Sequence, residues 1–387
     1  MKAVVCKGRA MSVMERPDPL PGPGQLLVKV LRCGICGSDL HVRDHCDHWG
    51  RMMKSQGYRA LISSNQEMVF GHEFSAEVIE AGPGTRTRLK PGTAVVALPL
   101  IRRGQDIELL GLSAHSPGAY AERVVVQETM TMTMPIPNGL PAADAALTDP
   151  MATGLHAVLR GEVKRKDVAI VIGCGPVGLA VICMLKAKGV SKIIASDFSP
   201  VRRAMAAHCG ATLVVDPAKE SPYARWQELG FINDVAGAFE LGMSTKEQLD
   251  KLPLPWWYLW SVGEYLGIGK TRPIIFECVG VPGILQSIIA SAPQFSRIVV
   301  VGVCMQTDAI EPAMAINKEI DMRFSLGYTP LDFRQALHMM AEGKVDAAPL
   351  ITGTVGLHGV ESVFDMLAKT PDHVKVLIDP SSQAVIV

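Results

Sequence analysis

The chain has 387 residues, 48% of them hydrophobic, which suggests two domains and is ample for two cores. The 38 Lys and Arg residues balance the 38 Asp and Glu residues, and this zero net charge gives no electrostatic footprint for nucleic acid or an anionic membrane surface. No apolar run approaches the roughly 20 residues of a membrane span, and a strand expected from Met1 to Cys6 leaves no room for a secretory signal.

The predicted elements divide the chain into two architectures. Residues 1 to about 45 and 67 to 135 give short strands punctuated by Pro and Gly, such as 25–31 and 77–80, which predicts a partly open antiparallel β-barrel. Residues about 152 to 327 alternate strands and helices, which predicts a doubly wound parallel sheet with strands at 169–172, 193–196, 213–215, 274–277 and 298–303. The chain then returns to the first domain through elements expected at 332–342, 350–357, 360–367 and 374–378. The predicted domains are therefore 1–151 with 328–387, and 152–327.

Three fragments far apart in the sequence fit one metal ion. They are the motif CGICGSDLH, which contains Cys36, the triplet GHE, which contains His72, and the pair Asp149-Pro150. A thiolate, an imidazole and a carboxylate make a set of three protein ligands, which leaves a tetrahedral zinc with one open position. An aspartate before a proline is equally suited to a turn or a helix cap, so a structural role for Asp149 remains an alternative to metal binding.

Other cysteines and histidines have simpler interpretations. Cys33 precedes Cys36 in a CxxC pair, but no second CxxC exists, so we expect Cys33 to be a small packed residue rather than half of a redox or zinc pair. His45, Cys46 and His48 have no recognised ligand spacing, and we do not expect a second metal there. The nine cysteines are scattered along the chain, as expected for reduced thiols in a cytoplasmic protein.

A glycine-rich fingerprint follows the third fragment closely. It is the GxGxxG pattern of Gly173, Gly175 and Gly178, which lies between an apolar strand and an apolar helix. A second strand then ends in Asp197, about 20 residues further on, which completes the context of a dinucleotide-binding site. The negative charge of Asp197 would repel a 2′-phosphate, which favours NAD over NADP. Arg202 and Arg203 complicate this, although a solvated helix face would also explain them.

With these residues, the chain resembles the zinc-dependent medium-chain dehydrogenase/reductase family of alcohol and polyol dehydrogenases. The resemblance implies an α/β protein with a GroES-like barrel as catalytic domain and a Rossmann domain for the coenzyme. Many relatives hold a second, structural zinc on four cysteines, but no cysteine occurs between Val95 and Val126. We therefore expect one zinc per chain and a lobe around 101–108 that is held by packing and charge pairs.

The resemblance also implies a role for individual residues. Cys36, His72 and Asp149 correspond to the zinc ligands, Ser38 and His41 to a proton relay, and Glu73 to the acidic neighbour of the metal. The coenzyme contacts that it implies are Thr153, Gly173, Gly175, Pro176, Val177, Gly178, Asp197, Arg202, Gly302 and Val303. The roles are chemically sound, because zinc lowers the pKa of a bound hydroxyl, and a histidine that titrates near neutrality can deliver the released proton to solvent.

Two segments, 44–70 and 222–271, have no counterpart in the family pattern. All five tryptophans lie within or beside them, at 49, 226, 256, 257 and 260. Tryptophan clusters prefer interfaces with one dry and one wet side, so each segment could form a subunit contact, a wall of the substrate pocket or simple packing. We favour a pocket wall for the first segment, because it joins two ligand-bearing fragments, and packing or a subunit contact for the second.

The sequence therefore predicts a zinc- and NAD-dependent dehydrogenase that acts on a small-molecule secondary alcohol or its ketone. A bulky, apolar substrate is expected from Leu98 and Pro99, where many relatives have an aromatic residue, and from the first segment. The alternatives are a polyol or diol dehydrogenase of the sorbitol or butanediol type, a disfavoured zinc-free quinone or enoyl reductase, and a non-catalytic NAD-binding scaffold. We expect a homodimer or homotetramer with no nucleic-acid partner and no membrane span.

Overall fold

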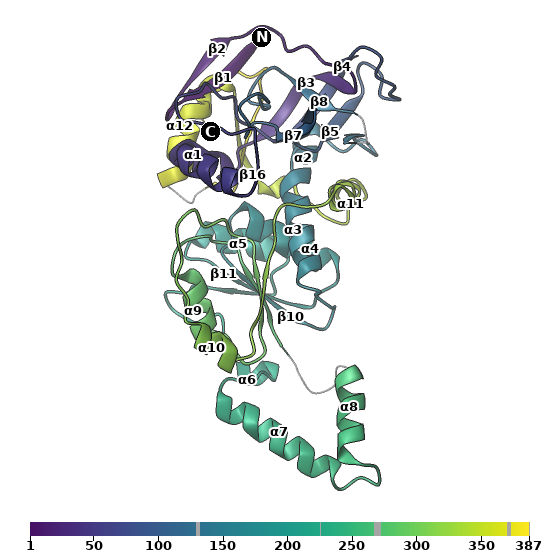
Figure 1. Cartoon of the computed structure of the whole chain (residues 1–387), viewed down its shortest axis with the longest axis vertical. Helices are drawn as coiled ribbons and strands as arrows, with labels where there is room; N and C mark the ends of the chain where they lie inside the picture. The colour runs from purple at the N-terminus through teal and green to yellow at the C-terminus, as the bar shows by residue number, and fades with distance from the viewer. Residues whose placement is uncertain (129–131, 225, 267–271, 370–372, 387) are drawn as a thin grey trace. The chain divides into compact units, whose positions relative to one another are not determined.

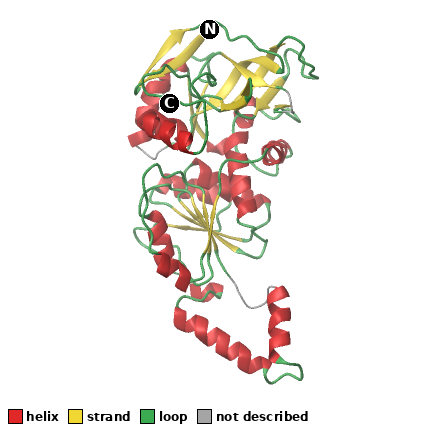
Figure 2. Cartoon of the chain, in the orientation of Figure 1, coloured by secondary structure: helices red, strands yellow, loops and turns green. Residues whose placement is uncertain are grey.

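The computed structural model describes residues 1–128, 132–224, 226–266, 272–369 and 373–386. It divides into two compact units, Met1–His156 with Gly327–Val387, and Ala157–Leu326. Of the expected 222–271 segment, residue 225 and residues 267–271 lie outside the described ranges. Figures 1 and 2 show that the first unit is rich in strands, whereas the second is a sheet flanked by helices.

The first unit is built on a seven-stranded sheet. Its strands follow the order β16-β17-β3-β4-β5-β9, with β8 also paired to β3. All pairs are antiparallel except β16 with β17. Two further pairs, β1–β2 and β6–β7, are antiparallel hairpins. The strands of this unit are β1 (Lys2–Lys7), β2 (Ala10–Glu15), β3 (Gln25–Gly34), β4 (Glu73–Ala81), β5 (Ala94–Ala97), β6 (Leu100–Arg103), β7 (Asp106–Leu109), β8 (Arg123–Gln127), β9 (Thr133–Pro135), β16 (Ile351–Val355) and β17 (Lys375–Ile378).

Helices and a large apolar cluster complete this unit. The helices are α1 (Gly37–Ser55), α2 (Ala142–Ala145), the start of α3 (Thr148–Arg160), α11 (Pro330–Ala341) and α12 (Val360–Lys369). The core joins residues from β1, β3, β4, β5, β8 and α12. Tyr120 and Phe364 lie at its centre, where their rings meet edge to face at 6.0 Å. Because distant segments share this core, the C-terminal residues are an integral part of the unit.

The second unit is a six-stranded parallel sheet in the order β12-β11-β10-β13-β14-β15. Its strands are β10 (Val168–Ile172), β11 (Lys192–Ser196), β12 (Leu213–Val215), β13 (Ile274–Glu277), β14 (Arg297–Val300) and β15 (Asp321–Phe324), and its helices are α4 (Pro176–Ala187), α5 (Pro200–Cys209), α6 (Trp226–Leu229), α7 (Val235–Leu249), α8 (Trp256–Leu266), α9 (Ile284–Ser291) and α10 (Pro312–Asn317). Figure 1 shows α4 and α5 on one side of the sheet and α9 and α10 on the other. Helices on both faces explain why β10 and β13 are buried along their whole length and why β10 is entirely apolar.

The predicted α/β class, a GroES-like barrel domain with a doubly wound parallel sheet, is confirmed. The strand expected at 298–303 is wrong at its end, because β14 stops at Val300. The backbone amides of Val301 and Gly302 both donate to the carbonyl of Glu277, which turns the chain out of the strand direction. All nine cysteines lie within the described residues, and none of them forms a disulfide. Within the described ranges, no helix is both long enough and apolar enough to cross a membrane.

Candidate metal and coenzyme sites

Cys36 lies where β3 gives way to α1. It is the N-cap of that helix, and its backbone amide donates to the carboxylate of Asp39 at 3.1 Å. The helix N-terminus carries a partial positive charge that favours a thiolate. Burial nevertheless raises the pKa of Cys36, and the neighbouring His72 offsets this only in part. A cation is therefore needed to hold the sulfur as a thiolate at neutral pH, and a bound metal ion has this effect.

His72 and Glu73 lie at the start of β4, and Gly71 fixes their position. Gly71 has φ of +102°, and a Cβ there would lie 2.5 Å from the ring of Tyr120, so only glycine fits this backbone. In the sheet, Glu73 pairs with Gly34 of β3, two residues before Cys36. The register of β3 and β4 thus places the GHE triplet beside the cysteine.

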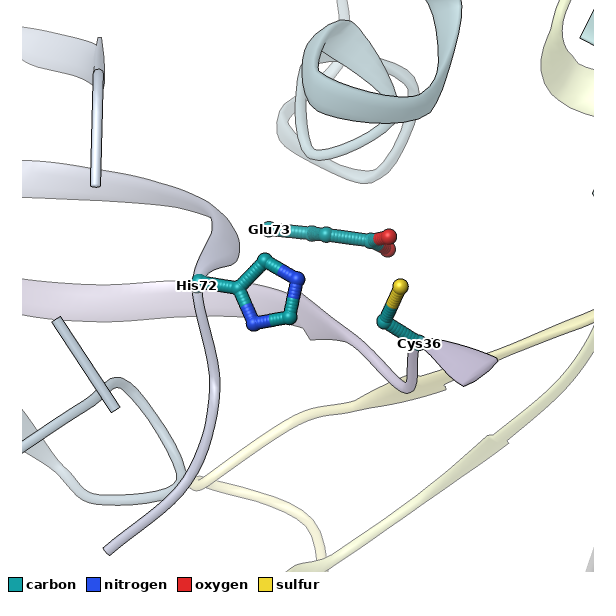
Figure 3. A group of neighbouring side chains, drawn as sticks. All are labelled: Cys36, His72 and Glu73. Carbon is teal, nitrogen blue, oxygen red and sulfur yellow. The ribbon is translucent and has the colours of Figure 1, made fainter. Parts of the chain in front are cut away.

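The three side chains of Cys36, His72 and Glu73 converge (Figure 3). Their ligand atoms all lie within 4.8 Å of one another. This is the only such group of at least three His, Cys, Asp or Glu residues among the described residues, and His45, Cys46 and His48 do not form one. A sulfur, an imidazole nitrogen and a carboxylate oxygen at this spacing suit a tetrahedral zinc ion.

Asp39 orients the imidazole of His72, a role that the sequence interpretation missed. Its side chain is 0% exposed, and its Oδ1 lies 3.2 Å from Nδ1 of His72. The Tyr120 hydroxyl donates to Oδ2 of Asp39 at 2.7 Å. Burial alone would lower the pKa of His72, but the Asp39 carboxylate raises it well above its ordinary value. A proton held on Nδ1 leaves Nε2 free for a metal, as in carboxylate–histidine–zinc triads.

Glu73 is paired with a buried lysine from the C-terminal strand. Lys375 Nζ lies 2.6 Å from Oε2 of Glu73 and donates to the carbonyl of Ile35 at 3.0 Å. Strand β17 pairs with the end of β3, which brings Lys375 to this point. Burial would lower the pKa of Lys375, but Glu73 raises it, so the ammonium stays charged. The negative charge of Glu73 is therefore already compensated inside the protein.

Asp149 lies outside the group of three ligand atoms, although it is buried close enough to feel their charges. It is in the first turn of α3, and the hydroxyl of Tyr328 donates to its Oδ1. Burial raises the pKa of Asp149 to about 6, while His72 and the tyrosine act in the opposite direction. Tyr328 is a second residue that the sequence interpretation missed, because 179 positions separate the two partners. Coordination by Asp149 therefore remains a prediction.

Ser38 and His41 both lie at the start of α1. The Oγ of Ser38 is 3.3 Å from Nε2 of His72, so the serine lies directly beside a ligand atom. His41 is one helical turn further on, and residues three apart share a helix face. Burial and the nearby His45 lower the pKa of His41, which keeps the imidazole neutral and able to accept a proton at pH 7. The geometry suits a relay from the metal site along the helix.

In the second unit, the glycines of the fingerprint are required by close contacts. Gly173 follows β10 with φ of +88°. A Cβ on Gly178 would lie 1.9 Å from the carbonyl oxygen of Gly173, so no other residue can occupy that position. Gly175 is the N-cap of α4 and Pro176 its first residue. The free amides of this helix N-terminus form a site for the pyrophosphate of a dinucleotide.

Asp197 is fixed at the end of β11 by two backbone amides. Its Oδ2 accepts a hydrogen bond from Cys174 at 2.7 Å, and its Oδ1 accepts one from Ser199 at 2.8 Å. Arg203 donates to two backbone carbonyls, at Asp197 and at the next residue, and pairs with Asp216 at 3.3 Å. The carboxylate thus holds the fingerprint loop and the following turn together.

The remaining predicted coenzyme contacts are spread over both units. Val177 lies in the first turn of α4, and Arg202 in α5 has a buried Nε without a hydrogen-bond partner in the described structure. Gly302 and Val303 follow β14, and a Cβ on Gly302 would lie 2.4 Å from the amide nitrogen of Gly280. Thr153 belongs to the first unit, where its hydroxyl donates to the carbonyl of Asp149 at 3.1 Å. Coenzyme binding by these residues remains a prediction.

The first extra segment, 44–70, packs onto its own unit. It extends α1 and then returns through a loop in which Ile62 and Phe70 are buried in the apolar core. The hydroxyl of Tyr58 accepts a hydrogen bond from the amide of Leu109 at 2.9 Å and bonds the hydroxyl of Ser113. These contacts tie the segment to the β6–β7 hairpin, which belongs to the lobe around 101–108.

The lobe has its own polar contacts. Glu108 is buried and accepts a hydrogen bond from the Ser116 hydroxyl at 2.7 Å, and Arg103 donates to that same hydroxyl at 3.0 Å. Leu98, part of the argument for a bulky substrate, is almost fully buried in the structure. The preference for a bulky substrate therefore rests on the 44–70 segment more than on Leu98.

Comparison with known proteins agrees with this arrangement. The model of the alcohol dehydrogenase GroES-like domain matches residues 22–138, and that of the zinc-binding dehydrogenase family matches residues 176–342. The (R,R)-butanediol dehydrogenase of Bacillus subtilis is 31% identical over 376 residues, which cover 94% of this chain and 95% of the relative. Human sorbitol dehydrogenase is 25% identical over 379 residues, 95% of this chain and 92% of the relative. The crystal structure of 2R,3R-butanediol dehydrogenase from Bacillus subtilis superimposes with a TM-score of 0.73 at 29% identity and covers 98% of this chain and 99% of that chain.

Proposed function

The chain belongs to the zinc-binding dehydrogenase family, and on that premise we propose that it transfers a hydride between NAD(H) and a secondary alcohol or its ketone. It is an alcohol oxidoreductase that uses zinc and a nicotinamide coenzyme. The convergence of Cys36, His72 and Glu73 carries the proposal, because this donor set suits a catalytic zinc with an open position. When bound, zinc supplies a Lewis acid that lowers the pKa of a substrate hydroxyl.

Residues of the chain bind the metal, transfer the proton and bind the coenzyme. Cys36 and His72 hold the metal, with Glu73 or Asp149 as the carboxylate ligand. Ser38, beside His72 Nε2, takes the proton of the substrate hydroxyl, and His41 passes it to solvent. The amides at the start of α4 hold the coenzyme pyrophosphate.

NAD is proposed over NADP because the Asp197 carboxylate occupies the end of β11. Two amides fix it there, and its charge opposes a 2′-phosphate. Arg203 is already engaged by Asp216 and backbone carbonyls, so it does not offer a free guanidinium to a phosphate. The nine cysteines, all described and none in a disulfide, support a reducing compartment, and we place the enzyme in the cytoplasm as a homo-oligomer.

A diol or polyol dehydrogenase is the second candidate, and the names of the butanediol and sorbitol dehydrogenase relatives favour it. A panel of large secondary alcohols, vicinal diols and sugar alcohols, assayed by NADH absorbance, separates the two. Shortening the 44–70 segment to the length usual in the family is expected to change KM for large alcohols and to leave NAD affinity unchanged. Unaltered kinetics for large and small alcohols would remove this segment from the substrate site.

Elemental analysis tests the metal site itself. We expect about one zinc per chain in the loaded protein, and loss of both zinc and activity in His72→Ala. His48→Ala is the matched control, since His48 is exposed and outside the site. Two zinc ions per chain, one of them lost in His48→Ala, would assign a second site to the His45, Cys46 and His48 cluster. Full zinc content in His72→Ala would disprove the proposed ligand set.

A further inference from the structure

The helical arm, residues 234–266, consists of two helices that meet at a loop (Figure 1), and the proposed reaction does not use it. It consists of α7, a short loop and α8. Neither helix contains a single buried residue. Figures 1 and 2 show the pair projecting from the sheet of its own unit. The arm is thus not packed onto the domain that carries it.

Both helices of the arm are nevertheless apolar on their exposed faces. On each helix the exposed apolar residues recur every three or four positions, which is the spacing of a helix-packing seam. The seam residues are Val235, Phe239 and Met243 on α7, and Tyr258, Val262 and Tyr265 on α8. Phe239 is 71% exposed and Tyr265 is 91% exposed. Helix α8 is apolar around most of its circumference, and such helices are normally buried.

The attachment of the arm separates it from the coenzyme site of its unit. After the arm, the chain enters β13, which begins at Ile274. Before the arm, the carbonyl of Ile232 accepts a hydrogen bond from the backbone amide of Gln294, which lies just before β14. Both points at which the arm joins its unit therefore lie at the amino-terminal edge of the parallel sheet. Gly173 and Asp197 follow the carboxyl ends of their strands, the edge at which such sheets bind ligands. A wall of the substrate pocket is thus not the role of the arm.

The charges of the arm do not suit a membrane surface. Between 234 and 266 it has five acidic residues and two basic ones, a net charge of −3: Asp234, Glu240, Glu247, Asp250 and Glu264 against Lys246 and Lys251. Lys246 is already paired with Asp250 and lies 5.8 Å from the ring of Trp256. Peripheral helices that bind anionic lipid carry a basic polar face, and this arm has none.

The exposed apolar area, summed over both helices of the arm, approaches what a protein interface needs. Five aromatic residues of the arm are exposed: Phe239, Trp256, Trp257, Tyr258 and Tyr265. At roughly 150–250 Å² per aromatic side chain, their exposed parts add up to an area on the order of 600 Å². The apolar seam residues add to this. A stable interface buries about 800 Å² on each partner, whereas the largest apolar patch of a monomer is about 300–600 Å². An apolar surface of this size is typical of permanent partners rather than transient ones.

We propose that the helical arm is covered by the arm of a second copy of this chain. A permanent partner that accompanies every chain is most simply another copy, and a twofold axis makes the patch its own complement. The two seams of each arm then pack against those of the other as a four-helix arrangement. The hydrophobic burial stabilises two helices of 15 and 11 residues that would be marginal alone in water.

The test is the mass of the full-length protein in solution. The double variant Phe239→Glu with Tyr265→Glu places a negative charge on each seam, and two such arms repel each other. Light scattering after size exclusion at tens of micromolar protein is expected to give half the wild-type mass. Hydrogen exchange is expected to show protected α7 and α8 amides in the wild type and loss of that protection in the variant.

Matched variants separate pairing from misfolding. Leu20→Glu introduces the same charge at a residue that is 85% exposed in the other unit, and it is expected to keep the wild-type mass. Phe239→Leu with Tyr265→Phe preserves the apolar seams and is expected to keep it too. A wild-type protein with the mass of a single chain, or a double Glu variant with unchanged mass, overturns the proposal. So does binding of the wild type to phosphatidylcholine vesicles that the double variant loses without any change in mass.

Discussion

Replacing Asp39 by Asn tests how the protein prepares His72 for a metal. The substitution keeps the volume of a fully buried side chain, and the amide oxygen can still accept from the Tyr120 hydroxyl and the Cys36 amide. The amide NH₂, however, then faces Nδ1 of His72 across the 3.2 Å contact. Because an NH₂ group can only donate there, the imidazole must accept on Nδ1 and carry its proton on Nε2. In that tautomer the nitrogen beside Ser38 cannot bind a metal.

The expected cost is a loss of zinc affinity by 10- to 100-fold, the usual effect of removing a partner behind a histidine ligand. This corresponds to about 1.4 to 2.7 kcal/mol. Competition of the zinc-free protein with a chromophoric chelator at pH 7.5 measures the affinity, and NADH binding serves as the control for folding. Tyr120→Phe removes one donor to Asp39 but leaves the carboxylate, so it should weaken zinc binding by less than about 5-fold. A change within threefold for Asp39→Asn, or equal losses in both variants, would refute the tautomer argument.

Three further predictions concern proton transfer, coenzyme choice and burial. His41→Gln is expected to slow alcohol oxidation at pH 7 by about 10²-fold or more, with partial recovery at higher pH or in imidazole buffer; an unchanged pH–rate profile would exclude His41 from the relay. Asp197→Gly is expected to weaken NAD binding by about 1–3 kcal/mol and to improve relative use of NADP, as measured by calorimetry with both coenzymes; a wild-type preference for NADP would contradict the assignment. Burial raises the pKa of Asp149 from 3.8 to about 6. Ionisation of this carboxyl group therefore lowers the stability of the zinc-free fold: the loss is complete above pH 6 and absent below pH 4, where the group is protonated. Asp149→Asn should therefore stabilise the zinc-free protein against urea by up to about 3 kcal/mol at pH 8 and by less at pH 5, and an equal gain at both pH values would argue against this.

Local motifs account for the parts of the molecule that the sequence predicted well. The strands at 213–215 and 274–277 have the predicted bounds, because short apolar runs between turn residues specify buried strands directly. The glycines at 173 and 178 were selected for their spacing, and the structure shows the close contacts that require them. In these cases the determinants lie within a few residues of one another.

Tertiary contacts account for the parts that were missed. Asp39 lies inside the predicted CGICGSDLH motif, but its role depends on His72, which arrives only when β3 and β4 pair. Lys375 and Tyr328 follow the fingerprint by well over a hundred residues, and no local pattern links them to Glu73 or Asp149. A buried lysine in an otherwise apolar strand was the available signal for Lys375, since an unpaired charge is costly there.

Two buried pairs of opposite charges lie at the metal site before any metal binds. The raised pKa of His72 makes it a cation against Asp39, and Lys375 is a cation against Glu73. The Cys36 thiol is neutral because burial raises its pKa. Zinc can bind only the thiolate and the neutral imidazole, so it must displace one proton from Cys36 and one from His72. Each displaced proton makes the apparent zinc affinity rise by about tenfold per pH unit below the pKa of its group. The pH dependence of zinc binding is therefore set by Cys36 and His72, while Asp149, already ionised above pH 6, contributes only at lower pH.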